Sequence, residues 1–208
     1  MRIVTALLLV GLAASACGRA QPHRETSVAD QHKPEHSPEA LTLGRIQPRT
    51  GAGIELSSEA FPDEGAIDLR HSAYGDNLSP PLRWTPVAGA GAYAIVLEDP
   101  DAPMEKPFVH WMIWNIPGQA TSLPEGVPNN AVLVSPQGAI QGRNDNDSTG
   151  YFGPRPPQGH GVHHYHFQIF ALDGPLGLHA DADLRALTNA MQGRVIADGE
   201  MVGTYERP

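Results

Sequence analysis

The segment from Gly150 to Asp173 constrains the fold of this chain more than any other stretch. It reads GYFGPRPPQGHGVHHYHFQIFALD, so a loop rich in Gly and Pro leads through a cluster of histidines into an apolar run. Gly and Pro in a loop fix turns and allow close backbone approach. A rigid loop that delivers polar side chains to the start of a buried strand is a common way to build a small-ligand site. We therefore predict a strand from His163 onward, with a ligand site at its start.

Strand geometry sorts the histidines of this segment into two groups, because successive side chains point to opposite faces. His163 and Tyr165 share one face with the more apolar residues of the run, whereas His164 and His166 share the other face. We predict that His163 and Tyr165 face the interior or a pocket. His164 and His166 then point away from it.

A metal site is the natural alternative for so dense a histidine cluster, since imidazole is a common ligand of transition metals. The cluster contains His160, His163, His164 and His166. One strand cannot aim His163 and His164 at the same ion, which opposes a shared metal, although His164 and His166 with a distant acid remain a weak zinc alternative. We predict no metal and no cofactor.

Two further strands carry polar residues at their ends. Residues 92–98, AYAIVLE, predict a strand that ends at a DPDAP turn, where each proline holds its predecessor extended and so fixes Asp99 and Asp101. Residues 108–116, FVHWMIWNI, are apolar on both faces, which predicts a central, covered strand. His110 lies near its start, and strict alternation places it on the face of Met112 and Trp114.

Composition favours a mainly β fold, because 22 glycines and 20 prolines imply many turns. The clearest helix prediction is residues 182–196, with an apolar stripe, a cap at Asp181 or Asp183, and Gly193 as a candidate early end. Residues 199–207 predict a last strand. The formal net charge of -9 argues against nucleic acid as the main partner.

The N-terminal residues predict the location of the protein. Residues 1–16 combine a positive start with an apolar run too short to span a membrane, which is typical of a signal peptide. The sequence ASAC ends at Cys17, the only cysteine, and resembles a bacterial lipobox, with an ordinary secretory cut as the alternative because Ala14 stands where Leu is usual. Residues 17–50 then form a lipidated, polar, flexible tether, and residues 51–208 the folded domain. We predict an exported lipoprotein anchored in a bacterial cell envelope membrane.

The polar residues at the strand ends form a candidate anion site: Asp99, Asp101, His110, His163 and Tyr165. A protonated histidine donates from both ring nitrogens, and an adjacent aspartate raises the histidine pKa and orients the ring. Affinity for an anion should therefore rise as the pH falls through ~6.5, the value of an ordinary imidazole. The sequence has no G-x-S-x-G elbow and no Walker-type phosphate loop.

Four stretches resemble the phosphatidylethanolamine-binding protein family, in its bacterial Raf-kinase-inhibitor-like branch. They are GDNLSPPLRW at 75–84, DPDAP at 99–103 with VHW at 109–111, the opening segment from 150 to 165, and GTYER at 203–207. They stand in the family's order and cover most of the chain from about residue 50. One departure is His164, because the family usually has Arg there, which leaves the contacts of that Arg in doubt.

The resemblance implies a central antiparallel β-sheet, a smaller sheet packed on it and peripheral helices. It also implies a pocket for phosphate or a phospholipid head group, formed by Asp99, Asp101, His110, His163 and Tyr165, with Pro103 and Gly159 in its walls. Family members inhibit kinases or proteases by binding them, so a regulatory protein partner follows by analogy.

We predict a non-enzymatic binding protein. The alternative is an envelope hydrolase or isomerase that uses His110 or His163 as a base, oriented by Asp99 or Asp101. A third hypothesis is a purely structural surface protein. Because the domain is expected outside the cytosol, an envelope hydrolase or protease is an easier partner than a cytosolic kinase.

Overall fold

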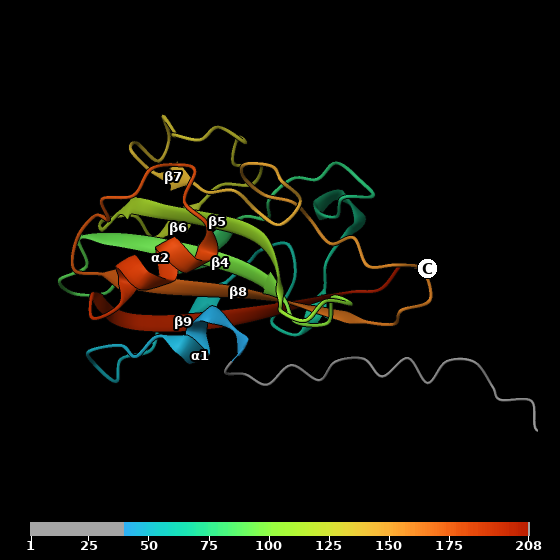
Figure 1. Ribbon diagram of the computed structural model, residues 1–208, viewed down its shortest axis with the longest axis horizontal. Coiled ribbons are helices and arrows are strands. Elements are labelled where there is room, and N and C mark those ends of the chain that lie inside the picture. The colour runs from blue at the N-terminus through green and yellow to red at the C-terminus, as the bar shows by residue number, and fades with distance from the viewer. Residues whose placement is uncertain (1–39, 208) are drawn as a thin grey trace, which may run out of the picture. The chain divides into compact units, whose positions relative to one another are not determined.

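The computed structural model describes residues 40–207 (Figure 1). The predicted signal peptide, Cys17 and most of the tether lie outside these residues. Between residues 40 and 207, no helix combines the length and the apolar character that a membrane crossing requires.

A six-stranded sheet forms the centre of the fold (Figure 1). Its strands, in spatial order, are β2 (Gly65–Ala66), β9 (Val195–Tyr205), β8 (His163–Leu172), β4 (Ala92–Asp99), β5 (Phe108–Pro117) and β7 (Ile140–Gln141). All neighbours pair antiparallel except β2 and β9. Strand β4 is buried along its whole length, as its continuous apolar sequence predicts.

A second, smaller sheet packs on one face of the large one. It contains β1 (Leu56–Ser57), β3 (Leu82–Trp84) and β6 (Ser122–Leu123), all antiparallel. Leu82 and Trp84 of β3 join Tyr93 and Leu97 of β4 in one buried hydrophobic cluster. The predicted mainly β fold, with a central sheet, a smaller packed sheet and peripheral helices, is confirmed.

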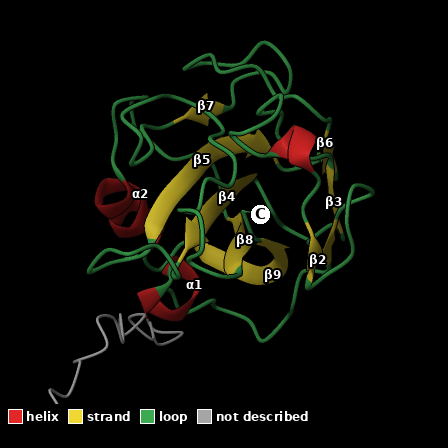
Figure 2. Ribbon diagram, turned by 90° about the vertical axis from the view of Figure 1, so that its right-hand side faces the viewer, coloured by secondary structure: helices red, strands yellow, loops and turns green. Residues whose placement is uncertain are grey.

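Helices cover the opposite face of the large sheet. Figure 2 shows α1 (Thr42–Arg45) and α2 (Leu184–Met191) on one side of the sheet, and β3 and β6 on the other. Leu187 and Met191 of α2 enter a second buried cluster with Val96 and Met112. A short 3-10 helix, η2 (Leu69–His71), lies outside both sheets.

The predicted helix 182–196 is too long at both ends. Asp183 caps α2 by accepting a hydrogen bond from the Ala186 N–H, which confirms one of the two predicted caps. The helix ends at Met191, and Gly193 turns the chain with a φ of 70°, a conformation that glycine adopts without a steric penalty. The last strand therefore begins at Val195, earlier than predicted.

The folded region begins before residue 51, where the sequence places its start. Leu41 and Ile46 are buried, and the Thr42 N–H donates to the Glu98 carboxylate over 2.8 Å. The Leu43 N–H donates to the side-chain oxygen of Gln168 over 2.6 Å. Too few apolar residues lie here to produce a periodic signal, and their partners are more than 50 residues away in the sequence, so residues 41–46 read as tether.

Candidate functional site

Three strand ends meet at one edge of the large sheet. Asp99 is the last residue of β4, His163 is the first residue of β8, and His110 lies near the start of β5. Strand β4 pairs antiparallel with both neighbours, so its end lies beside both of their starts. The topology therefore brings together three of the predicted site residues.

A β-bulge aims His110 at this site. Leu97 pairs with Trp111 and Glu98 pairs with Val109, so β5 has one extra residue, His110, between these pairs. A bulge of this kind redirects the side chains of the strand that contains it. The prediction that His110 shares the face of Met112 is therefore wrong, because Met112 enters the helix-side cluster while the His110 ring packs 5.2 Å from the ring of Tyr165.

Asp99 connects the two imidazoles. Its Oδ2 atom lies 2.8 Å from Nδ1 of His163 and 3.9 Å from Nε2 of His110. Its Oδ1 atom accepts the Asp101 N–H over 2.8 Å, which holds the turn that follows β4. All three side chains are at most 4 % exposed, so the group is withdrawn from bulk water.

The charge of Asp99 depends on these neighbours. Burial alone would raise the pKa of this carboxyl, but its interactions with His110 and His163 outweigh burial and lower the pKa to about 2. Asp99 is therefore ionised at neutral pH, and its Oδ2 atom accepts a hydrogen bond from Nδ1 of His163. An ionised carboxylate beside an imidazole also orients that ring.

A cavity of about 280 Å³ opens onto this group, close to the lower limit of about 300 Å³ for ligand pockets. Most of its lining is apolar or aromatic, and its ionisable members come from four segments of the chain. The lining residues are Asp99, Ala102, Pro103, Met104, Phe108, His110, Asn146, Phe152, Arg155, Pro156, Pro157 and His163. The cavity is thus a small apolar chamber with a few polar groups, as expected of a ligand site.

Tyr165 does not line the cavity but packs against the rings of His110 and His163, which do. Its ring is fully buried and lies 6.4 Å from the ring of His163. Within residues 40–207, its hydroxyl has no hydrogen-bond partner. Burial first, and the charge of Asp99 second, raise the pKa of Tyr165 far above its usual range, so the hydroxyl keeps its proton.

Asp101 and Gly159, two further predicted site residues, do not line the cavity. Asp101 Oδ2 accepts the His164 N–H over 2.8 Å and lies 2.6 Å from His164 Nδ1, so it ties the DPDAP turn to the start of β8. His164, the departure from the family pattern, thus has a polar partner. Gly159 lies in the loop before β8 with a φ of 74°. Pro103 lines the cavity as the resemblance implies.

The predicted alternation along β8 is confirmed. His163 and Tyr165 are buried, whereas His164 and His166 are partly exposed on the other face, where His166 Nδ1 lies 2.8 Å from a Glu200 carboxylate oxygen. In the described part of the chain, no three or more His, Cys, Asp or Glu side chains are grouped to hold a metal ion.

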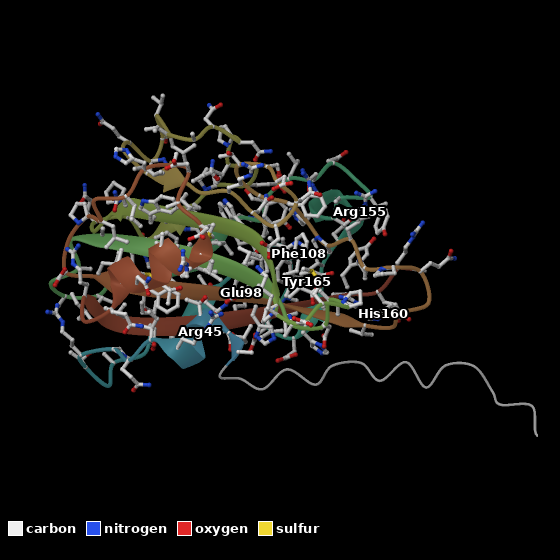
Figure 3. All side chains as sticks on the ribbon, in the orientation of Figure 1. Arg45, Glu98, Phe108, Arg155, His160 and Tyr165 are labelled. Atoms are coloured by element: carbon white, nitrogen blue, oxygen red, sulfur yellow. The ribbon has the colours of Figure 1, made fainter. Side chains whose placement is uncertain are left out.

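Sequence reasoning missed the Arg155 side chain, the aromatic walls and the contact made by His160. Phe108, Arg155, His160 and Tyr165 gather toward the same end of the sheet (Figure 3). The Phe152 ring stacks on the His110 ring, with centroids 5.7 Å apart, and the Phe152 carbonyl lies 2.7 Å from His110 Nδ1. The only sequence signal for Phe152, Arg155 and His160 is their place in the Gly- and Pro-rich loop that leads to β8.

Known proteins resemble this chain in sequence and in fold. The family model described as phosphatidylethanolamine-binding protein matches residues 57–206. A UPF0098 protein of Pyrococcus horikoshii is 44 % identical over 151 residues, which cover 72 % of this chain and 75 % of the relative. A UPF0098 protein of Methanothermobacter thermautotrophicus is 43 % identical over 155 residues, 74 % of this chain and 99 % of the relative.

Solved structures agree with the sequence relatives. Escherichia coli YbcL, described as a member of the mammalian PEBP family, superposes with a TM-score of 0.71 at 29 % identity, covering 76 % of this chain and all of YbcL. A phosphatidylethanolamine-binding protein homologue of Chlamydia trachomatis superposes with a TM-score of 0.67 at 31 % identity, covering 75 % of this chain and 99 % of its own. This chain belongs to the phosphatidylethanolamine-binding protein family.

Proposed function

We propose that this protein is a non-enzymatic binding protein that takes a small anion, such as phosphate or a phospholipid head group, in the cavity beside Asp99, His110 and His163. The observation that carries the proposal is this buried group, because an ionised carboxylate touches two imidazoles that both line a small cavity. Protonated imidazoles donate hydrogen bonds to an anion, and an adjacent carboxylate stabilises their charged form.

Arg155 supports an anionic ligand over a neutral one. Its side chain lines the cavity, and it forms no ion pair with any of the side chains that the structure describes. A guanidinium matches the oxygens of a phosphate or carboxylate with several donors at once. The ligand therefore meets a cation at one wall and the histidines at another.

A hydrolase or isomerase is the second candidate, because the Asp99–His163 contact is the pairing of an orienting acid with a base. Against it, the lining of the cavity within residues 40–207 contains no Ser, Thr or Cys to act as a nucleophile. We favour the binding protein, and turnover separates the two candidates.

The proposal includes an envelope location through lipidated Cys17 and a protein partner such as a protease or kinase. The first rests on the sequence around Cys17, and the second on analogy with the family. Metabolic labelling with a palmitate analogue, with Cys17→Ser as the control, tests the anchor. Label in both proteins or in neither would contradict it.

Calorimetric titration with inorganic phosphate and with phosphoethanolamine tests the ligand. The full chain carries Cys17→Ser so that no lipid is attached, and the pH is 6. We expect saturable binding that weakens at least about tenfold in His163→Ala, since a charge-assisted donor is lost. His166→Ala is the matched control on the opposite face of the same strand, and it should bind as the parent does.

Two outcomes contradict the binding proposal. Absence of saturation in the parent protein, or equal affinity in His163→Ala, would remove the cavity as an anion site. Release of phosphate from phosphoethanolamine that is lost in His163→Ala would instead establish the enzyme.

A further inference from the structure

His160 makes a contact that the predicted anion site did not include. Its Nδ1 atom lies 2.7 Å from Nε2 of His163, and the two ring centroids are 4.9 Å apart. His160 is partly buried, and it stands between Gly159 and Gly161, whose φ angles are 74° and 86°. These glycines let the loop turn its histidine onto the buried ring.

The protons of the three rings can be counted from their partners. Asp99 is ionised, so the contact of 2.8 Å with His163 Nδ1 requires a proton on that nitrogen. The Phe152 carbonyl only accepts, so His110 also carries its proton on Nδ1. A neutral imidazole has one N–H, and Nε2 of each ring is then a lone pair. At 2.7 Å, His160 Nδ1 must donate to His163 Nε2.

With neutral rings, the cavity wall opposes an anion. It presents the negative charge of Asp99 and two imidazoles whose Nε2 atoms accept rather than donate. Arg155 alone balances the carboxylate, so the charged lining sums to about zero. An anion enters favourably only when a proton enters with it, because protonation adds a positive charge beside the cavity.

The His160–His163 pair is the place for that proton. A proton from solvent adds to His160 Nε2, the remaining lone pair of the two rings, and the bridging proton between the rings can then shift onto His163 Nε2. In this step an N–H bond forms at His160 Nε2, the N–H bond at His160 Nδ1 breaks as one forms at His163 Nε2, and the pair gains one positive charge. The added charge lies next to ionised Asp99, which stabilises it, whereas His110 Nε2 is 3.9 Å from the same carboxylate.

We infer that the site binds its anion together with one proton, and that the His160–His163 pair holds this proton. The inference rests on the proposed function, since it assumes an anion in the cavity. It also names the preferred ligand class. A phosphate monoester, with its second pKa near ~6, can bring the proton itself, whereas a sulfate cannot.

The titratable and charged groups around the pair come from every neighbouring segment. They are Asp99 of β4, His110 of β5, Tyr165 of β8, Tyr205 of β9 as the register partner of His163, and Arg155 of the loop. Tyr165 keeps its proton, because burial raises its pKa, and Asp99 stays ionised, since its pKa is about 2. Neither Tyr165 nor Asp99 therefore changes its protonation near neutral pH, so neither takes up the proton.

Calorimetry with inorganic sulfate measures how many protons the protein takes up on binding. Sulfate carries no proton near neutral pH, so any proton taken up must come from the buffer. The full chain with Cys17→Ser is titrated at pH 7 in PIPES and in Tris, whose different ionisation enthalpies reveal proton uptake. We expect about one proton taken up per sulfate and tighter binding of phosphate than of sulfate. In His160→Gln, uptake should fall well below one half and sulfate should bind roughly tenfold more weakly.

Three results overturn the inference while leaving anion binding intact. They are sulfate binding without proton uptake, unchanged uptake in His160→Gln, and uptake that is lost in His110→Gln but kept in His160→Gln. His166→Gln is the matched control and should keep both uptake and affinity. If neither sulfate nor phosphate binds the parent protein, the proposed function itself fails.

Nitrogen–proton correlation spectra of the histidine rings test the proton count without any ligand. The ligand-free protein at pH 7.5 should show the Nδ1–H tautomer for both His110 and His163. An Nε2–H tautomer at His163 would make this ring the donor in the His160 contact and would overturn the count.

Discussion

Glu98 and Asp99 are neighbours in sequence, and both are buried acids, but they serve opposite faces of the large sheet. Glu98 is fully buried on the helix side, where its Oε2 atom accepts hydrogen bonds of 2.8 Å from the Thr42 N–H and the Gln168 side-chain amide. Arg45 donates to its Oε1 atom over 3.2 Å. A backbone amide, a side-chain amide and an arginine do not titrate near neutral pH. This cluster fixes α1 on the sheet.

Asp99 has partners of another kind. Its neighbours are two imidazoles, His163 at 2.8 Å and His110 at 3.9 Å, and both line a cavity. In Figure 3, Glu98 and Arg45 lie to the left of Arg155 and His160, away from the end of the sheet where the cavity residues gather. Burial of a carboxylate therefore does not reveal its role. A structural acid is distinguished from a candidate binding residue by the groups around its carboxylate and by whether those groups face a cavity.

Glu98→Ala should give the largest effect on stability. The Gln168 amide and the Thr42 N–H lose their acceptor, so we expect a loss of about 3 kcal/mol in the free energy of unfolding, moderated because Arg45 can turn to water. Chemical denaturation measures it. Phosphate affinity should stay within about twofold, because Glu98 faces away from the cavity.

The matched control for this variant is Glu59→Ala, which breaks an ion pair with Arg83 in which both side chains are mostly exposed. Exposed pairs of this kind contribute little, so its denaturation curve should overlay that of the parent. If Glu98→Ala is as stable as the parent, or if it stays folded but loses phosphate binding, then Glu98 is not a purely structural acid and does not differ from Asp99 in role.

Asp99→Asn should produce a smaller loss of stability, which is present at neutral pH and disappears in acid. Because the interactions with its histidines lower the pKa of Asp99 to about 2, the folded protein binds fewer protons than the unfolded chain at pH 2 to 4. The contribution of Asp99 is present above pH 4 and is lost as the pH falls toward 2, in total about 2 kcal/mol.

Urea unfolding between pH 2 and pH 5 measures this contribution. The parent protein should lose stability more steeply than Asp99→Asn over that range, and the two curves should run parallel from pH 4 to pH 5. Parallel curves over the entire range would mean that Asp99 has an ordinary carboxyl pKa, and its contrast with other acids would disappear.

The sequence predicts the framework of the fold and the centre of the site. Strands β4, β5 and β8 follow from apolar runs, and alternation alone separates His163 from His164. The sequence-based prediction of the site missed two kinds of feature. The bulge at His110 is invisible because the residues on both sides of it are apolar, so an inserted residue leaves no mark in the pattern.

Long-range contacts account for the other omissions. The loop that carries Arg155 and His160 is placed by bonds such as Phe152 N–H to the His110 carbonyl, and no local pattern encodes these bonds. Residues 41–46 join the fold through hydrogen bonds to Glu98 of β4 and Gln168 of β8 and through burial of Leu41 and Ile46. Sequence reasoning detects elements that carry their own periodicity, and it misses segments whose position depends on distant acceptors.

His164→Arg should have the smallest effect. It tests whether Asp101, the partner of His164, has a structural role like Glu98 or a ligand-site role like Asp99. Asp101 is a third acid of the same region, with a side chain 13 % exposed, and it holds the backbone and the ring of a histidine that points away from the cavity. An arginine, the residue usual in the family at this position, keeps the backbone N–H and can pair with Asp101 through its guanidinium.

We expect phosphate affinity within about twofold of the parent and a nearly unchanged melting temperature, because the pair is partly exposed. Titration calorimetry and thermal denaturation check both values. A tenfold change in affinity would mean that the turn held by Asp101 positions Asp99, and Asp101 would then belong with the ligand site rather than with the scaffold.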